Sequence, residues 1–274
     1  MTVFTSPSFT LHRQVVFCND PEIGLRAVIA IHDTTFGPAL GGCRIWPYGS
    51  EDEAVEDVLR LSRGMTYKAS LARIALGGGK SVIIGDPAQL KSEALFESFG
   101  RFVAGLGGRY IVAEDVGTSV ADMQIVRRET EHVRGIPETG GGDPSPVTAF
   151  GVYHGVRAAV RYRLGRETLA GVRVTVQGLG HVGMELCRRL VDDGAELTVT
   201  DINPDAVRAA LAALPVHPVE PDAIIGLAAD VFAPCALGGG LNDETIPRLE
   251  VSVVAGAANN QLAEDRHGAM LRAR

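Results

Sequence analysis

The spacing of apolar and polar residues changes near residue 140 and divides the chain into two parts with different rhythms. In the first part, short apolar runs predict strands at 15–17, 25–31, 81–84 and 110–113. A Ser-x-x-Glu capping box at 50–53 predicts the start of an amphipathic helix that continues to about residue 65. A further helix is expected over 89–106, so residues 1–140 are predicted to form a mixed α/β domain.

The second part alternates strand and helix more regularly. Apolar runs at 172–176 and 196–200 predict buried strands, and each is followed by a helical pattern. Between the two parts, the turn-forming segment ETGGGDPSP (138–146) interrupts regular structure. Because alternating strands and helices build parallel sheets with helices on both faces, residues 141–274 are predicted to form a Rossmann-type, doubly wound nucleotide-binding domain.

A G-x-G-x-x-G motif lies between the first strand and first helix of this second part. It consists of Gly178, Leu179, Gly180, His181, Val182 and Gly183. In a dinucleotide-binding turn the first glycine allows the bend, the second admits the pyrophosphate, and the third lets the helix pack on the strand. Asp201 ends the next strand, where a carboxylate accepts hydrogen bonds from ribose hydroxyls and repels a 2′-phosphate. The motif therefore predicts NAD as the cofactor. The alternative is a chance glycine turn with an unrelated aspartate, and His181 is interpreted as a solvent-facing loop residue.

A second glycine run, LGGGKSVIIGDP (76–87), differs from a phosphate-binding loop. That loop needs a glycine where this chain has Ile74, and a helix must follow it, whereas 81–84 has the pattern of a strand. Glycines preceding a strand are expected to let the backbone turn and a ligand approach closely. Lys80 is then a candidate acid or base, because burial favours the uncharged form of a lysine. The alternative is a surface turn with a solvated lysine.

Composition narrows the class of partner. The net charge is −7 and the pI about 5.5 without any long basic tract, which argues against nucleic acid. No apolar run is long enough to span a bilayer, so no membrane partner is expected. The four cysteines are far apart, and nothing has metal-ligand spacing, so no metal site or disulfide framework is expected and a reducing cytoplasm is predicted.

Several further motifs follow one another in a fixed order. They are GPALGGCR (37–44), GMTYKAS (64–70), LGGGKSVIIGDP (76–87), AEDVGT (113–118), DPSPVTAFGV (143–152), the glycine loop, APCALGG (233–239) and AGAANNQL (255–262). Together they resemble the Glu/Leu/Phe/Val amino-acid dehydrogenase family over nearly the whole chain. The resemblance implies an N-terminal catalytic domain and an NAD-binding Rossmann domain, usually in a homo-oligomer. It also implies reversible oxidative deamination of an L-amino acid to a 2-oxo acid and ammonia.

The resemblance also implies roles for individual residues. Lys80 takes the place of the family's catalytic lysine, Asp115 takes part in proton transfer at the amine, and Lys68 binds the substrate carboxylate. Gly41, Gly42 and Met65 line the site around that carboxylate, Thr148 and Asn259 lie near the nicotinamide and substrate, and Leu40 and Ala113 line the side-chain pocket. The last two imply a branched aliphatic substrate such as leucine, valine or isoleucine. The physical hypothesis is that Lys80 takes a proton from water attacking the imine carbon.

Alternatives remain for single residues and for the whole chain. Lys68 at a helix end is also compatible with a solvated lysine, and Asp115 with a cap or an Asx-turn. Compared with the family, the chain is expected to be shortened at its C-terminus, as a fragment, as one of two pairing chains or as a folded protein without turnover. The alternative function is therefore a homologue that binds nucleotide or amino acid without turnover. NADP-dependent glutamate oxidation is disfavoured by Asp201 and by the uncharged Leu40 and Ala113.

Overall fold

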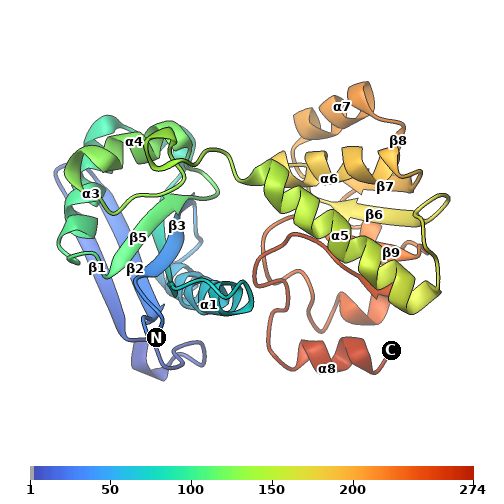
Figure 1. Ribbon diagram of the computed structural model, residues 1–274, viewed down its shortest axis with the longest axis horizontal. Helices are drawn as coiled ribbons and strands as arrows, with labels where there is room; N and C mark the ends of the chain where they lie inside the picture. The colour runs from blue at the N-terminus through green and yellow to red at the C-terminus, as the bar shows by residue number, and fades with distance from the viewer. Residues whose placement is uncertain (1–2) are drawn as a thin grey trace. The chain divides into compact units, whose positions relative to one another are not determined.

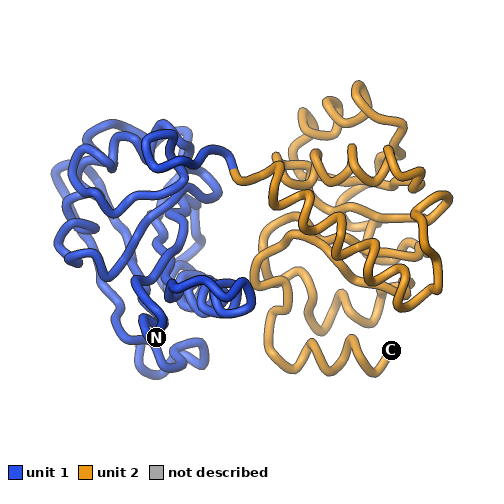
Figure 2. Tube along the Cα trace, viewed as in Figure 1, with its two compact units in different colours: residues 1–143 blue, residues 144–274 orange. Residues whose placement is uncertain are grey.

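The computed structural model describes residues 3–274 and divides the chain into two compact units. Unit 1 comprises residues 1–143 and unit 2 comprises residues 144–274 (Figure 2). The division falls inside the segment 138–146, which holds only a short 3₁₀ helix, η2 (Pro137–Thr139), before α5 begins at Ser145. The mixed α/β class with a Rossmann-type second half is confirmed by the two sheets.

Unit 1 is built on a five-stranded mixed sheet in the order β1-β2-β4-β3-β5 (Figure 1). The strands are β1 (Gln14–Asp20), β2 (Leu25–Asp33), β3 (Ala39–Trp46), β4 (Gly77–Ile84) and β5 (Tyr110–Glu114). The pairs β1–β2 and β2–β4 are antiparallel, whereas β3 pairs in parallel with both β4 and β5. The central strand β4 is almost entirely buried, which explains its nearly continuous apolar pattern after residue 80.

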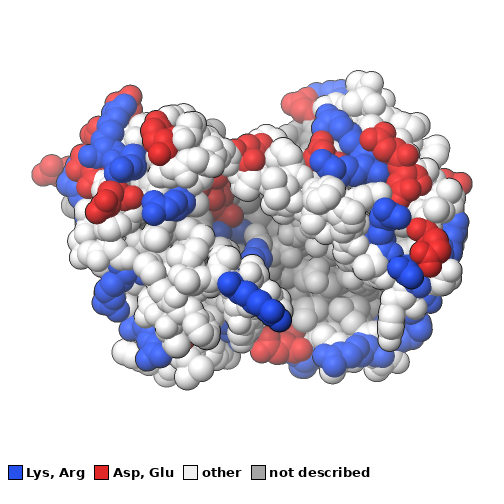
Figure 3. All heavy atoms as spheres, in the orientation of Figure 1, with Lys and Arg blue, Asp and Glu red and all other residues white. Residues whose placement is uncertain are grey.

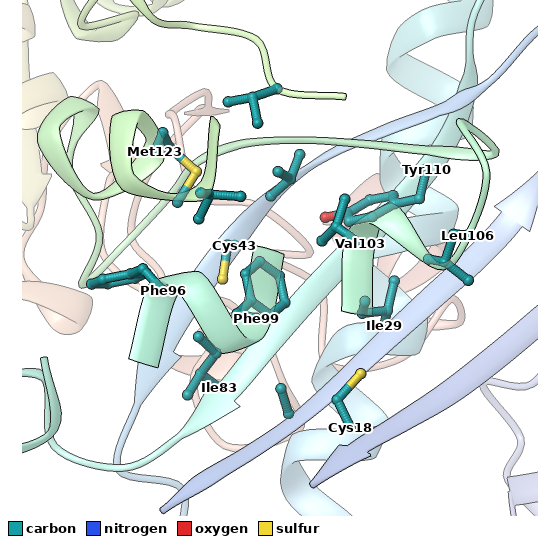
Figure 4. Packing of buried hydrophobic residues seen from close by; sticks show 14 of the residues in the cluster. Cys18, Ile29, Cys43, Ile83, Phe96, Phe99, Val103, Leu106, Tyr110 and Met123 are labelled. Carbon is teal, nitrogen blue, oxygen red and sulfur yellow. The ribbon is translucent and has the colours of Figure 1, made fainter. Parts of the chain in front are cut away.

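Helices cover both faces of this sheet. On one face, α1 (Glu51–Leu71) packs through Ala54, Val58 and Leu59 against apolar residues of β2 and β4. On the other face, α3 (Glu93–Ala104) and α4 (Val120–Glu129) enclose the larger core shown in Figure 4. Short helices α2 (Pro87–Leu90) and η1 (Val3–Thr5) complete the unit. His32 fixes the later turns of α1 to the sheet, because its Nδ1 lies 2.8 Å from the hydroxyl of Thr66.

Three sequence expectations about unit 1 were wrong in detail. The strand expected to follow Lys80 begins at Gly77, so the glycines and Lys80 belong to β4 itself. The helix expected over 89–106 is interrupted, because Ser92 is extended and caps α3 by accepting a hydrogen bond from the Leu95 amide. Strand β3 was missed, since its glycine-rich sequence lacks the pattern of a strand.

Unit 2 contains a five-stranded, fully parallel sheet in the order β10-β9-β6-β7-β8. Its strands are β6 (Arg173–Gln177), β7 (Glu196–Thr200), β8 (Val216–Pro218), β9 (Val231–Pro234) and β10 (Val253–Val254). Its helices are α5 (Ser145–Leu164), α6 (His181–Asp192), α7 (Pro204–Ala213), α8 (His267–Arg272), η3 (Ile224–Gly226) and η4 (Ile246–Arg248). Counted along the chain, the strand order is 3-2-1-4-5 read from β8, which is the order of the nucleotide-binding fold. The crossover that reverses it lies between β6 and β9.

Three general features concern residues 3–274. No helix among them is both long and apolar enough to cross a membrane. All four cysteines are free thiols, and burial raises the pKa of Cys18 and of Cys187 to about 12. On the face drawn in Figure 3, positive and negative side chains are interspersed in each unit, without a continuous basic patch.

Candidate active site

Strand register gathers most of the predicted site residues of unit 1 on one face of its sheet, whereas Gly41, between Leu40 and Gly42, belongs to the opposite face. Leu40 pairs with Ile111 and Gly42 pairs with Ala113, so these alternating positions share a face. The pairing of Leu40 with Gly78 places Lys80, two residues later on β4, on the same face. Asp115 directly follows β5 and continues the alternation. This is the face that α1 covers, and α1 carries Met65 and Lys68.

Lys80 and Asp115 form a buried ion pair on this face. The Lys80 ammonium nitrogen lies 2.9 Å from Asp115 Oδ1, and their side chains are 4% and 15% exposed. Gly42 lies beside the pair, because a Cβ at this position would come within 2.7 Å of Asp115 Cβ and 3.2 Å of Lys80 Nζ. Any larger residue at 42 would therefore push these two groups apart.

Arg44 holds the second oxygen of the same carboxylate. Its Nε donates to Asp115 Oδ2 at 2.9 Å, and the arginine is 4% exposed. Burial alone would raise the pKa of Asp115, but the charges and hydrogen bonds of Lys80 and Arg44 lower it to about 2. Asp115 is thus a permanent carboxylate at physiological pH. Sequence reasoning missed Arg44, because a charge inside ALGGCRIW becomes a signal only once this stretch is recognised as a strand.

The AEDVGT segment fixes the backbone of Asp115. The hydroxyl of Thr118 accepts from the Asp115 amide at 2.9 Å and lies 2.9 Å from the Cys43 carbonyl oxygen. Gly117 has a positive φ of 82°, and a Cβ there would lie 2.3 Å from the carbonyl oxygen of Ile45. These contacts tie the end of β5 to β3, so the position of Asp115 is set by the sheet.

The glycines before Lys80 serve packing within unit 1. A Cβ would lie 1.9 Å from the Asp33 carbonyl oxygen at Gly77, 2.1 Å from the Thr66 nitrogen at Gly78, and 2.7 Å from the Tyr110 ring at Gly79. Gly41 is equally confined, since a Cβ there would lie 1.7 Å from the Gly79 carbonyl oxygen. The presence of these glycines, expected to let a ligand approach the backbone, is thus also explained by the protein's own close packing.

Lys68 lies on the last turn of α1 and completes the charged group. Its side chain reaches solvent, yet partial desolvation lowers its pKa, and the positive charges of Lys80 and Arg44 lower it further while Asp115 raises it. The positive charge of Lys80 thus disfavours the charged form of Lys68. The half-buried Met65, Leu40 and Ala113 supply apolar surface on the same face.

Lysine is rare in this chain. Of its 26 cationic side chains, 23 are arginines, and the three lysines are Lys68, Lys80 and Lys91. An arginine keeps its proton under all ordinary conditions, whereas a lysine can release one. Two of the three lysines thus belong to the candidate site, and one of them, Lys80, has the role in which proton transfer is expected.

In unit 2, the three motif glycines have different environments. A Cβ at Gly178 would lie 2.6 Å from the Ala236 nitrogen, and one at Gly183 would lie 2.0 Å from the Gly178 carbonyl oxygen. At Gly180 a Cβ would meet no atom within 4 Å. The protein itself therefore requires the first and third glycines, whereas the middle one leaves open space where a pyrophosphate is expected to approach. The residues present fit a dinucleotide.

The amino end of α6 faces the same turn. Gly180 caps this helix, and its first turn contains no acidic residue, so its amide groups favour an anion. Asp201 supports the turn, because its Oδ2 accepts from the Leu179 amide at 2.6 Å and its Oδ1 accepts from the Asn203 amide at 2.8 Å. Each carboxylate oxygen retains a lone pair for a ribose hydroxyl. His181 is the first residue of α6, not a loop residue as expected, and it is exposed.

Thr148 and Asn259 occupy separate elements of unit 2. Thr148 is exposed on the first turn of α5. Asn259 lies in the loop after β10, which joins the loop after β9 through a hydrogen bond from the Gly239 amide to the Asn260 carbonyl. These two loops and the glycine loop all follow the carboxyl ends of adjacent parallel strands, where doubly wound sheets bind ligands.

One cluster of metal-ligand type occurs in the part of the chain that the structure describes. Ligand atoms of Asp243, Glu264 and His267 lie within 4.8 Å of one another. Arg266 forms ion pairs with both carboxylates, and the acids are exposed. The guanidinium of Arg266 therefore supplies the positive charge that the two carboxylates of this cluster face.

Comparisons with known proteins agree with this fold. Residues 12–132 match the family model described as Glu/Leu/Phe/Val dehydrogenase, dimerisation domain, and the chain belongs to this family. It is similar to leucine dehydrogenase of Geobacillus stearothermophilus, with 58% identity over 94% of this chain and 71% of that protein. Phenylalanine dehydrogenase of Bacillus thermotolerans is 52% identical over 95% of this chain and 70% of its own length. The crystal structure of L-tryptophan dehydrogenase from Nostoc punctiforme has a TM-score of 0.70 and 45% identity, covering 96% of this chain and 75% of that one.

Proposed function

We propose that the protein is an amino-acid dehydrogenase that oxidatively deaminates a branched-chain L-amino acid, leucine, valine or isoleucine, with NAD as the acceptor. The observation that carries the proposal is the buried pair of Lys80 and Asp115 on the face of the sheet that also presents Lys68. A binding protein has no need for a buried lysine held against a carboxylate. The leucine dehydrogenase relatives support the same reaction class.

The chemistry follows from the charges of the amino acid. Lys68 offers a positive charge to the substrate carboxylate, and Asp115 offers an acceptor to the substrate amine. When NAD is bound, it supplies the hydride acceptor. In its neutral form, Lys80 takes a proton from the water that adds to the imine carbon and becomes an ammonium. Asp115 relays that proton from Lys80 to the amine that departs as ammonia, so it ends the step as a carboxylate again. Both groups lie on rigid strands or directly after one, which suits reacting groups that must keep their geometry.

Substrate and cofactor choice rest on fewer contacts. Leu40 and Ala113 are uncharged and half-buried on the site face, which supports an aliphatic over an acidic side chain. The relatives named for leucine and for phenylalanine have similar identities to this chain, 58% and 52%. The proposed preference for branched aliphatic side chains therefore depends on the size of the side-chain pocket. Asp201 supports NAD over NADP because its charge repels a 2′-phosphate. We also propose a homo-oligomer, supported by the dimerisation domain of the family model.

The proposal is tested by following NADH absorbance at alkaline pH. The purified chain is mixed with NAD or NADP and separately with L-leucine, L-valine, L-phenylalanine, L-tryptophan or L-glutamate. We expect reduction of NAD with leucine or valine. Folded protein that binds NAD or amino acid but reduces NAD with none of them would favour the alternative, a homologue without turnover.

The glycine loop gives a prediction that separates ligand contacts from packing. Gly180→Ala is expected to leave the thermal unfolding temperature nearly unchanged, because its Cβ meets no atom within 4 Å, but to weaken NAD binding about tenfold or more. Gly183→Ala is expected to lower the stability by more than about 1 kcal/mol, because its Cβ would lie 2.0 Å from a carbonyl oxygen. NAD titration and thermal unfolding of both variants measure the two effects. Unchanged NAD affinity in Gly180→Ala would contradict the assigned pyrophosphate position.

A further inference from the structure

Arg44 lies at the centre of a buried chain of polar contacts behind the proposed reacting groups. Its Nε donates to Asp115 Oδ2 at 2.9 Å, and its Nη1 donates to Asp57 Oδ2 at 2.8 Å. The same Asp57 oxygen accepts from the hydroxyl of Tyr48 at 2.7 Å. Only 4% of Arg44 is exposed, so the guanidinium is held by these contacts and not by water.

The two oxygens of Asp115 are thereby divided between two cations. Oδ1 lies 2.9 Å from Lys80 Nζ, and Oδ2 accepts from Arg44. With Oδ2 fixed, the carboxylate cannot rotate about its terminal bond, and Oδ1 stays directed at Lys80. The planar guanidinium gives one N–H to Asp115 and another to Asp57, so it holds the two carboxylates in a fixed relation that a single point charge would not impose.

We propose that Arg44 is a positioning residue that holds Asp115 so that Oδ1 faces Lys80 and the substrate amine. Arg44 does not touch the reacting atoms. Asp57, on α1, supplies the opposing charge that keeps the guanidinium in place, and Tyr48 orients Asp57 from the loop before that helix. This inference rests on the proposed function for its kinetic consequences, but the contacts themselves do not depend on it.

Three features favour positioning over a purely structural role. Arg44 comes from the middle strand of the three that carry the site, between β4 with Lys80 and β5 with Asp115. The backbone of Asp115 is already fixed by Thr118 and Gly117, so the remaining freedom lies in the carboxylate that Arg44 binds. Moreover, α1 also packs on the sheet through an apolar cluster that does not include Arg44.

The test uses substitutions that separate folding from positioning. Arg44→Met alone leaves two buried carboxylates without their shared cation and endangers the fold. The double variant Arg44→Met/Asp57→Asn removes one positive and one negative charge, so the local net charge is unchanged, and Tyr48 keeps an oxygen acceptor at residue 57. Asp57→Asn serves as its reference, and Arg173→Met removes a half-exposed arginine ion pair in unit 2 as a control.

We expect the double variant to fold and to have a kcat about 100-fold below that of Asp57→Asn, with the KM for the amino acid changed less than about threefold. Arg44→Lys keeps the positive charge but lacks the planar guanidinium that binds both carboxylates. Its kcat is expected to lie between those of the double variant and the unsubstituted protein. Arg173→Met is expected to match the unsubstituted protein. A double variant as active as Asp57→Asn, or full recovery by lysine, would overturn the positioning role.

A second readout does not require turnover. The Asp115 carboxyl is followed by carbon NMR during a pH titration, with Asp115→Asn used for assignment. Loss of Arg44 is expected to raise the pH at which this carboxyl titrates in the double variant relative to Asp57→Asn. Unchanged titration would overturn the positioning role of Arg44, whether or not any amino acid reduces NAD. Absence of turnover with every amino acid would instead count against the proposed function.

Discussion

Replacing Lys80 with alanine is expected to lower kcat for the amino acid by about 10²- to 10⁴-fold, the range contributed by a positioned acid or base. The amino group of Lys80 is nearly inaccessible to solvent and lies 2.9 Å from Asp115, and alanine leaves no group at this position that can take up a proton. The glycine loop after β6 belongs to a different compact unit from Lys80. The hydrogen bond that supports this loop joins Leu179 to Asp201 and does not involve Lys80. NAD affinity is therefore expected to remain unchanged.

Arginine at the same position distinguishes proton transfer from charge. Lys80→Arg keeps the positive charge beside Asp115 but cannot release a proton, so it is expected to be about as inactive as Lys80→Ala. Lys91→Ala, which removes a lysine from a partly exposed pair with Asp122, controls for loss of a lysine elsewhere in unit 1. Initial rates measure kcat, and NAD titration with thermal unfolding verifies the fold.

An active arginine variant would leave Lys80 with an electrostatic role and remove it as the base. Normal turnover in Lys80→Ala would exclude it from the mechanism entirely. Loss of both turnover and NAD binding would indicate a folding defect, and the arginine variant, which preserves the ion pair, then decides between the roles.

Much of the fold was predictable because local patterns agreed with the tertiary structure. The parallel sheet of unit 2 follows from its regular alternation of buried strands and helices, and the glycine turn lies after β6 as its motif requires. Unit 1 was harder. Strand β3 is rich in glycine because β4, the end of β5 and Asp115 approach its backbone closely, and these are contacts between residues distant in sequence. A pattern confined to neighbouring residues contains no signal for them.

The same limit applies to the candidate site. Lys68, Lys80 and Asp115 were assigned from a family resemblance, and their meeting on one face depends on the register of β3, β4 and β5. Arg44 was missed because the sequence shows it as one charge among 26 cationic residues. Its importance becomes visible only when both of its buried carboxylate partners are located.

Asp115→Asn tests the other half of the buried pair, and kcat is expected to fall by about 10²- to 10³-fold. Asparagine keeps the shape of the side chain but removes the charge that attracts the substrate ammonium, so the KM for the amino acid is also expected to rise. Lys80 and Arg44 lose their shared anion, and such an uncompensated buried charge typically costs about 3 to 5 kcal/mol of stability. Denaturant unfolding of the variant is expected to show a loss of this order.

The low pKa of Asp115 allows the effect of Asp115→Asn on amino-acid affinity to be compared with the effect of acidic pH. Because Lys80 and Arg44 lower its pKa to about 2 against the effect of burial, the group is a carboxylate at every pH above about 4. Acidifying the wild-type protein to about pH 5.5 is therefore not expected to reproduce the loss of amino-acid affinity that asparagine causes. Calorimetric titration with L-leucine at about pH 5.5 and 8 compares the two proteins, and Asp230→Asn, which loosens an exposed pair with Arg173, provides the control. If the wild-type affinity instead fell to that of the asparagine variant at the lower pH, Asp115 would have to take up a proton there, and the ion pairs with Lys80 and Arg44 would not govern its charge.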